Sequence, residues 1–264
     1  MGEQSLFVLE AWQICLILFA GIISFALLGY KAGKKSRVLS HKTSNGFEIS
    51  RTGLMTLLSL ILAFTLSTSG ERYHAYKKVL INEVNCINSA SQSSDLYPEP
   101  YRSEFRKYFL EYMDARILFF EAGTDFAKIN ESKEKYKSAG KKLWDLSSSL
   151  FEKPEFINAS RISSPSILEM IDAATTTEAS LRSKVPFEIP LLIYIISFIL
   201  AYLGGYGSTQ FGRNEWLYLI TFGFILTIVT YIILDLDRPD TGFIKSTVEE
   251  NALIDLKTEF IKTK

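Results

Sequence analysis

The sequence predicts an all-α integral membrane protein, with four transmembrane helices and one helical, water-facing domain inserted between the second and the third. Three observations predict this fold class. Charged residues make up 22% of the 264 residues, but four long apolar stretches contain almost none of them. The segment between the second and third stretches repeats apolar residues at steps of three and four, as amphipathic helices do. Nowhere do apolar and polar residues alternate over a length typical of a strand.

The four apolar stretches have the length that a membrane span needs. A bilayer core of about 30 Å requires roughly 20 predominantly apolar residues in a helix. We therefore expect spans at about residues 11–30, 53–70, 189–206 and 216–234. Buried helices of a large soluble core are the alternative interpretation, but such helices normally carry a polar stripe. Amphipathic aromatic rings near the span ends favour the membrane interpretation, namely Trp12, Tyr30, Tyr206, Trp216 and Tyr231.

These spans divide the chain into four parts. We predict a transmembrane hairpin over residues 1–70, a helical water-facing domain over 71–186, a second transmembrane hairpin over 187–235 and a C-terminal tail over 236–264.

The inserted domain is expected to consist of helices. The first continues the second span without a break and ends before Pro98 and Pro100, which force a turn. The next starts near Glu99, and a third and a fourth run over about 125–151 and 166–183. Aromatic residues mark one face of the helix that starts near Glu99, and such a face serves packing more often than it forms a ligand cage.

Composition and motifs exclude several classes of function. Lys and Arg together number 29, as do Asp and Glu, so the chain lacks the net basic charge typical of nucleic-acid binding. We find no glycine-rich phosphate loop, nucleophile elbow or histidine-rich metal motif, and therefore expect no enzyme, metal or cofactor. Three aspartates near the end of the fourth span include Asp237 and Asp240, but Pro239 interrupts any calcium-loop spacing. We interpret this segment as a helix stop at the membrane interface.

The distribution of positive charge predicts the sidedness in a cell (inner) membrane. Short loops rich in Lys and Arg stay cytoplasmic. The loop between the first two spans carries six basic residues and one acid, Glu48, which places both termini and the 71–186 domain outside the cytoplasm. Arg72, Lys77 and Lys78 follow the second span closely and argue for the opposite orientation.

The second span carries a face of small residues. Its members recur at steps of three and four and are Thr52, Thr56, Ser59, Ala63, Ser67 and Gly70. Hydroxyls on small side chains are suited to a pore wall, since they leave room and replace part of an ion's hydration shell. The alternative is close packing between helices, which small residues also permit.

Three polar residues gather where the second span ends, namely Glu71, Arg72 and His74. One interpretation is a charged ring that selects ions. The other is that they anchor the helix end at the lipid headgroups.

Four short motifs, called the sequence marks below, occur one after another from the second span onward. An Arg-Tyr pair follows a span that ends in Phe-Thr-Leu-Ser, then come a Glu-Val-Asn element, a Leu-Tyr-Pro-Glu-Pro segment and a Leu-Asp-Arg-Pro segment. This pattern resembles a bacterial membrane-protein family of unknown function, the bestrophin-like domain family. Asp240 and Thr241 depart from it, as do three of the six residues over 83–88. The matching residues are Arg72, Tyr73, Glu83, Asn85, Pro98, Pro100, Asp237, Arg238, Pro239 and Gly242.

This resemblance covers most of the chain. Bestrophins are oligomeric anion channels with four spans and a helical cytosolic domain. The resemblance therefore implies a homo-oligomer that conducts small inorganic ions, and it implies that the large domain faces the cytosol, against the charge argument. The sequence lacks an evident acidic calcium clasp of the kind that animal bestrophins carry.

Two functions from different classes fit the sequence. The first is an oligomeric ion channel, or channel-like pore, lined by the second span and anion-conducting by resemblance. The second is a membrane-tethered helical module that binds or senses a ligand and acts through a partner protein. A symmetric homo-oligomer favours the channel, because one protomer with four spans can hardly enclose a pore.

Overall fold

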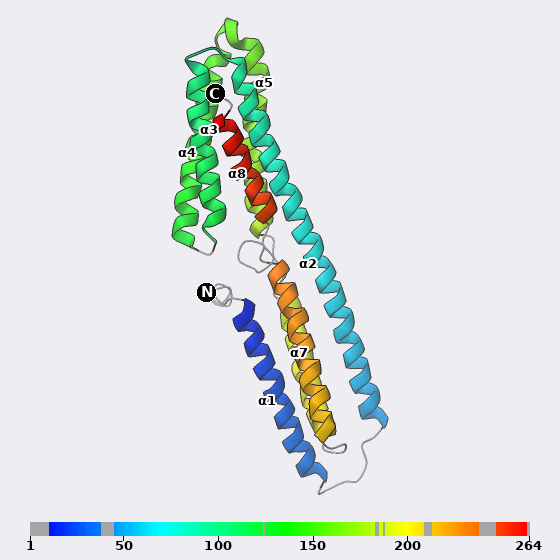
Figure 1. The fold of residues 1–264 in the computed structure, drawn as a ribbon. Coiled ribbons are helices and arrows are strands. Elements are labelled where there is room, and N and C mark those ends of the chain that lie inside the picture. The colour runs from blue at the N-terminus through cyan, green and yellow to red at the C-terminus, as the bar shows by residue number, and fades with distance from the viewer. Residues whose placement is uncertain are drawn as a thin grey trace. The chain divides into compact units, whose positions relative to one another are not determined.

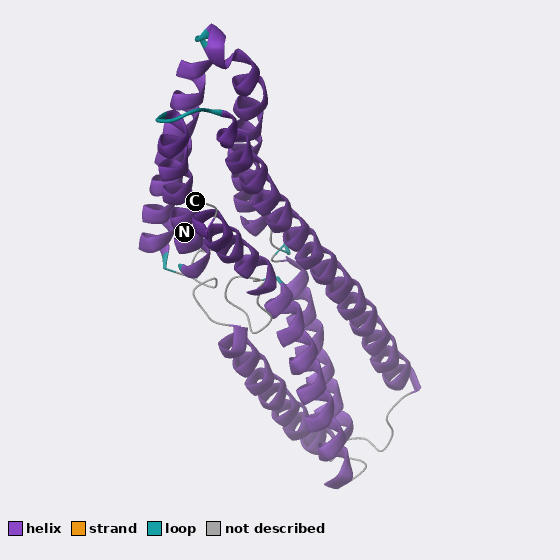
Figure 2. Cartoon of the chain, turned by 45° about the horizontal axis from the view of Figure 1, so that its top comes forward, coloured by secondary structure: helices purple, strands orange, loops and turns teal. Residues whose placement is uncertain are grey.

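The computed structural model describes residues 11–37, 45–123, 125–182, 185–186, 188–208 and 213–237, and a last segment at 247–262. Within them the chain is helical apart from short turns (Figure 2). The elements are α1 (Ala11–Arg37), α2 (Asn45–Ser93), η2 (Ser94–Leu96), α3 (Tyr101–Glu121), α4 (Phe126–Phe151), η3 (Pro154–Phe156), α5 (Ile157–Arg182), α6 (Glu188–Ser208), α7 (Arg213–Leu236) and α8 (Thr247–Lys262).

The predicted fold class is confirmed. Four of these helices are long and apolar enough to cross a membrane, at Ala11–Lys35, within Gly46–Leu96, at Glu188–Ser208 and at Trp216–Leu236. The protein is therefore a multi-pass, all-helical membrane protein. Large apolar side chains such as Leu60 and Leu217 are two-thirds exposed on these helices, which water would disfavour and lipid tolerates.

The chain forms two compact units. The membrane unit comprises residues 1–72 and 184–237, and the domain unit comprises 73–183 and 238–264. The membrane unit contains α1, α6, α7 and the first part of α2, and the domain unit contains the second part of α2 and the other helices (Figure 1).

Glycines set the closest helix contact in the membrane unit. A Cβ atom on Gly205 of α6 would lie 1.9 Å from the carbonyl oxygen of Ala26, and one on Gly29 of α1 would lie 2.0 Å from that of Tyr202. Both distances are far below van der Waals contact, so the backbones of α1 and α6 touch at these two positions. Membrane helices that lack a hydrophobic driving force gain packing energy through such approaches.

The domain unit has an aromatic and aliphatic core. The aromatic face expected after Glu99 supplies much of it, since Phe105, Phe109, Tyr112 and Met113 of α3 are fully buried. Helix α4 packs against α3, and α5 packs against α4, and both add further apolar side chains to this core. Helix α8 adds Leu253 and Phe260 to the same core.

Two elements of the domain unit differ from the sequence-based expectation. Helix α5 starts at Ile157 and contains Pro165, whereas the expected helix started near Ser166 because proline normally ends a helix. The C-terminal tail was predicted without secondary structure, and residues 247–262 of it form α8.

Helix α2 runs without a break for 49 residues. At 1.5 Å per residue it is about 73 Å long, more than twice the roughly 30 Å of a bilayer core. It ends at Ser93, as expected from the turn that follows, but begins at Asn45 and so precedes the expected span by several residues.

Candidate functional site

The small-residue face of α2 is exposed in the protomer. Thr52, Thr56, Ser59, Ala63 and Ser67 are exposed, and Gly70 is half-buried. The opposite face of the helix carries the buried Leu58, Thr65 and Ser69. Only 11% of the most apolar part of α2 is buried, against 22% to 33% in the other three spans. Helix α2 is therefore the span with the smallest buried share within the protomer.

Two hydroxyls of this face, those of Thr56 and Ser59, donate their protons within the helix. Thr56 Oγ1 donates to the carbonyl oxygen of Thr52 at 3.0 Å, and Ser59 Oγ donates to that of Met55 at 2.9 Å. Each hydroxyl has a single proton and two lone pairs, so its oxygen remains an acceptor toward the outside. The lone pairs of these two hydroxyl oxygens thus give the exposed surface a weakly negative potential.

A second sector of α2 beside the small residues is apolar and bulky. Leu57, Leu60 and Phe64 are each between 45% and 67% exposed. The exposed side of α2 thus contains one strip of small, mostly polar residues. A second strip, of large apolar residues, lies about 100° further around the helix axis.

The three polar residues at the end of the second span differ in exposure. Arg72 is half-buried, and its Nη1 lies 3.9 Å from Oδ1 of Asp237 at the end of α7. Glu71 and His74 are exposed. Arg72 thus has a structural partner in its own protomer, and a charged ring formed by the three residues stays a prediction.

Asp237 also binds the backbone just before α6. Its two carboxylate oxygens accept from the backbone N–H of Val185, at 3.0 and 3.2 Å. Two residues of the sequence marks, Arg72 and Asp237, therefore meet in the membrane unit and connect the middle of α2, the end of α7 and the segment just before α6. Three others, Arg238, Pro239 and Gly242, lie outside the described residues.

Glu83, another residue of the sequence marks, forms a buried ion pair in the domain unit. Arg116 of α3 donates from Nε to Oε1 of Glu83 at 2.6 Å, and from Nη2 to Oε2 at 2.8 Å. Burial alone would lower the pKa of Arg116, but the carboxylate of Glu83 raises it above its ordinary value. The pair joins the second part of α2 to α3.

Aromatic rings enclose the guanidinium of this pair. Its Cζ lies 4.6 to 4.8 Å from the ring centroids of Phe119, Phe120 and Tyr136. Nη1 of Arg116 has no hydrogen-bond partner, and its place among ring faces provides cation–π contact instead. Arg116 was missed in the sequence, although it continues the aromatic face of α3 one turn beyond Tyr112.

The remaining sequence marks lie on the surface. Tyr73 is half-buried and its ring lies 5.7 Å from Nζ of Lys77. Asn85, Pro98 and Pro100 are exposed, the two prolines in the turn between η2 and α3. The exposed prolines end one helix and open the next, so they shape the fold.

These features define a class: a four-span, all-helical membrane protein. The structure of a bacterial bestrophin homologue from Klebsiella pneumoniae superposes with a TM-score of 0.68, covering 92% of this chain and 98% of that chain at 11% identity. One single-residue variant of that homologue superposes with a TM-score of 0.69 at 10% identity, covering 94% of this chain and 97% of that chain. Another superposes with a TM-score of 0.66 at 12% identity, covering 92% of this chain and 98% of that chain. At such identity the similarity establishes the fold, and the expected bestrophin-like fold is confirmed.

Neither a protein-family model nor a curated protein sequence matches the chain.

Proposed function

We propose that this protein is the subunit of a homo-oligomeric ion channel whose pore is lined by the small-residue face of α2. The observation that carries the proposal is the exposure of that face: Thr52, Thr56, Ser59, Ala63 and Ser67 contact no other part of their own protomer closely enough to be covered. A hydroxyl-bearing surface inside a bilayer faces either water or another protein more favourably than lipid. Four spans cannot enclose such a path, so copies around a symmetry axis are required.

The length of α2 supports the same proposal. A helix of about 73 Å exceeds the bilayer core by roughly 40 Å. If copies of the first part of α2 surround a pore, the continuation of the same helix gives the conduction path walls beyond the membrane.

The sign of the conducted ion is the part of the proposal that rests on fold similarity. Bestrophins are anion channels, and we propose anion conduction on that ground. The hydroxyls of Thr56 and Ser59 donate inward and offer lone pairs outward, which suits a cation or water better than an anion. An anion would have to draw these protons away from their carbonyl partners. Reversal potentials in a KCl gradient test the sign directly.

Flux through liposomes tests the channel itself. Purified protein should pass ions, and Ser59→Trp or Ser67→Trp should reduce the flux at least about tenfold, because an indole fills a narrow path. Leu217→Trp is the matched control, since Leu217 is exposed on α7 and not on α2. Absence of flux from a stable symmetric oligomer, or equal loss in the control, would refute the proposal.

A tethered binding module remains the second candidate. Its supporting observation is that the domain unit exposes large apolar side chains, with Phe126 76% and Ile162 56% exposed. These side chains could contact a partner protein or another copy of the chain. Native mass spectrometry separates the two, because a monomer that co-purifies with a second protein supports the module and a homo-oligomer supports the channel.

A further inference from the structure

The first residue of α4, Phe126, has the most exposed large apolar side chain among the residues that the structure describes. Its exposed fraction is 76%, and the next highest in the domain unit are 56% for Ile162 and 52% for Leu96. A single exposed ring on a protein surface is common. The position of Phe126 in the fold therefore decides what the ring can contact.

Three residues on neighbouring helices give the level of Phe126 along the domain unit. Glu83 of α2 accepts from Arg116 of α3 at 2.6 Å, and Cζ of Arg116 lies 4.6 Å from the ring centroid of Tyr136 of α4. Short turns join α2 to α3 and α3 to α4, so α2 and α4 run in the same direction. Phe126 precedes Tyr136 by ten residues, as Tyr73 precedes Glu83 by ten, which is about 15 Å on each helix. Phe126 is therefore nearly level with Tyr73.

Contacts between α4 and α5 give the same level. Three pairs join the two helices, namely Lys133 with Glu178, Gly140 with Ile171, and Ser147 with Ser164. From one pair to the next, α4 advances by seven residues and α5 goes back by seven, as expected of antiparallel helices. One further step of seven leads to Phe126 on α4 and, on α5, to three residues past its end at Arg182. Phe126 thus lies at the end of the domain unit where α5 leads into the membrane unit.

This level is next to the bilayer core. The span expected over residues 53–70 ends three residues before Tyr73, or about 4.5 Å along the continuous helix α2. The membrane-crossing helix α6 begins at Glu188, six residues after Arg182. A bilayer of about 40–45 Å with a core of about 30 Å has a headgroup layer of about 5–7 Å on each side. The level of Tyr73, and with it Phe126, falls within this layer.

The charged groups beside Phe126 are compatible with a lipid surface. Asp125 caps α4, since its Oδ1 accepts from the backbone N–H groups of Ala127 and Lys128 at 3.1 and 3.2 Å, and its Oδ2 lies 3.7 Å from Nζ of Lys128. The side chain of Lys128 is 72% exposed, and a lysine ammonium can reach lipid phosphates while its stem covers apolar surface. An aromatic ring next to a cation is typical of protein segments that lie at a membrane surface.

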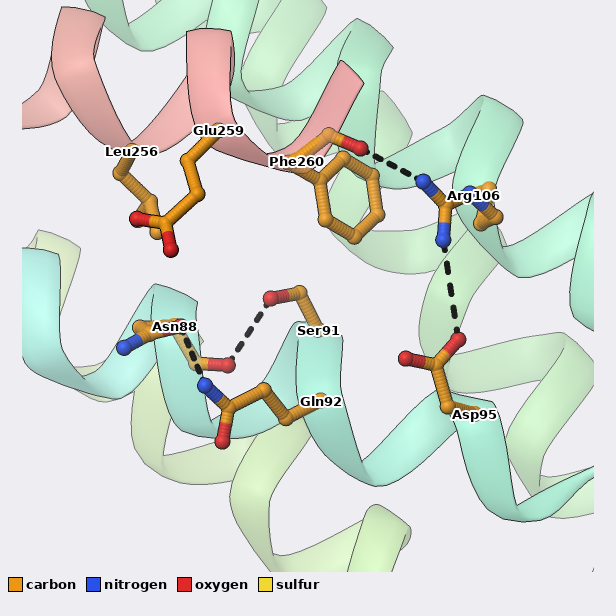
Figure 3. A pocket seen from close by; sticks show the side chains of 8 residues that line it. All are labelled: Asn88, Ser91, Gln92, Asp95, Arg106, Leu256, Glu259 and Phe260. Atoms are coloured by element: carbon orange, nitrogen blue, oxygen red, sulfur yellow. Dashed lines mark hydrogen bonds and ion pairs between the residues drawn. The ribbon is translucent and has the colours of Figure 1, made fainter. Parts of the chain in front are cut away.

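The part of the domain unit beyond this level has a polar surface where it is hollowed. Figure 3 shows a pocket there, in which Arg106 lies 3.7 Å from Oδ1 of Asp95, and Gln92 donates to Asn88 at 3.0 Å. Asn88 is 15 residues beyond Tyr73 on α2, or about 22 Å. These polar side chains pair with one another, as is suited to a surface in contact with water.

We propose that the first turn of α4 binds the headgroup layer of the bilayer. The ring of Phe126 inserts at the boundary between headgroups and acyl chains, and the ammonium of Lys128 lies among the phosphates. The domain unit is then held at the membrane by this turn in addition to the chain connections at residues 72–73, 183–184 and 237–238.

Quenching of a fluorescent probe by labelled lipid tests the proposal. The full-length protein receives one added cysteine, Ala127→Cys or Ser149→Cys, both at exposed positions of α4 and about 33 Å apart, and each is labelled with the fluorophore NBD. Cys15 and Cys86 are buried, and the unmodified protein treated in the same way gives the background. The labelled proteins are reconstituted into phosphatidylcholine vesicles with or without a phosphatidylcholine that carries a nitroxide near its headgroup.

The nitroxide lipid should quench NBD at position 127 at least about twofold and leave NBD at position 149 nearly unchanged, because only the first site lies within the headgroup layer. Phe126→Asp, added to the Ala127→Cys protein, should remove most of this quenching. Phe151→Asp, at the other end of α4, is the matched control and should leave it unchanged. Since Phe126 and Phe151 are both exposed, both variants should keep the parent Tm in detergent.

Three results would overturn the proposal. They are equal quenching at the two sites, absence of quenching at position 127, and quenching there that persists in Phe126→Asp. A blue-shifted NBD emission at position 127 without quenching would assign the turn to a protein contact and overturn the proposal as well. The assay requires no ion flux, so its outcome is independent of the channel assay.

Discussion

Removal of one partner of the buried ion pair between Glu83 and Arg116 should destabilise the domain unit strongly. Both side chains are essentially inaccessible, at 1% and 0% exposure, and two hydrogen bonds of 2.6 and 2.8 Å join them. Glu83→Gln keeps the shape but leaves the guanidinium as an uncompensated buried charge. Loss of one member of such a pair costs about 3–5 kcal/mol. At about 2–4 °C per kcal/mol for a chain of this size, the expected fall in Tm is about 6–20 °C.

The double replacement separates burial of charge from loss of packing. Glu83→Leu combined with Arg116→Met removes both charges and keeps much of the volume. Replacing a buried pair by apolar side chains is often neutral or stabilises the protein by about 1–4 kcal/mol. The double variant also loses the cation–π contacts of Arg116 with three rings, and such contacts contribute up to about 2 kcal/mol when desolvated. The double variant should therefore unfold well above either single variant.

Thermal unfolding of the purified protein, followed by tryptophan fluorescence, measures these effects. Trp144 packs against the core of the domain unit and reports on it. The exposed pair Glu131–Lys135 on α4 provides the control, since Glu131→Gln should leave Tm unchanged. A Tm for Glu83→Gln within about 2 °C of the unmodified protein, or a double variant as unstable as the singles, would refute the reasoning.

Three further expectations follow from the packing and the charges. Burial, and then the nearby carboxylate of Glu83, raises the pKa of Tyr112 above its ordinary value of 10.0, so the stability that its neutral hydroxyl contributes is present below pH 10 and is lost as pH rises further. The Tm of the unmodified protein should thus fall more steeply above pH 10 than that of Tyr112→Phe. Gly205→Ala should destabilise the membrane unit by about 1–3 kcal/mol, whereas Gly53→Ala, where a Cβ meets nothing within 4 Å, should raise Tm slightly. Single cysteines can be introduced at Ser148 in the domain unit and at Lys34 in α1, which are both exposed. If the domain lies outside the cytoplasm, an impermeant maleimide should label intact cells at position 148 and not at position 34. Labelling at position 34 alone would show the opposite orientation.

The spans and the continuity of α2 could be predicted because their signals are local. A run of apolar residues of sufficient length, such as 53–70, has few structures open to it besides a membrane helix. Since no proline or glycine-rich turn lies between Gly70 and Pro98, the same helix is expected to continue, and it does.

The internal partners could not be predicted, because they depend on residues distant in the chain. Arg116 has the helical phase of the buried aromatic face, yet a charged side chain is expected at the surface unless its partner is known. That partner, Glu83, lies on another helix. Helix α8 was missed for a related reason: its few apolar residues, such as Leu253 and Phe260, suffice only because the core of the domain unit receives them.

The unbroken course of α2 constrains how its sequence can change in length. Each residue added to a helix turns everything beyond it by about 100° and moves it by 1.5 Å. Ser67 and Glu83 are separated along α2 by a phase of about 160°, so one residue inserted between them would turn the small-residue face of α2 by about 100° relative to the helix face that carries Glu83. An insertion of seven residues would restore the phase to within about 20°. Among relatives of this chain, length differences between these two positions should therefore be absent or come in multiples close to whole helical turns.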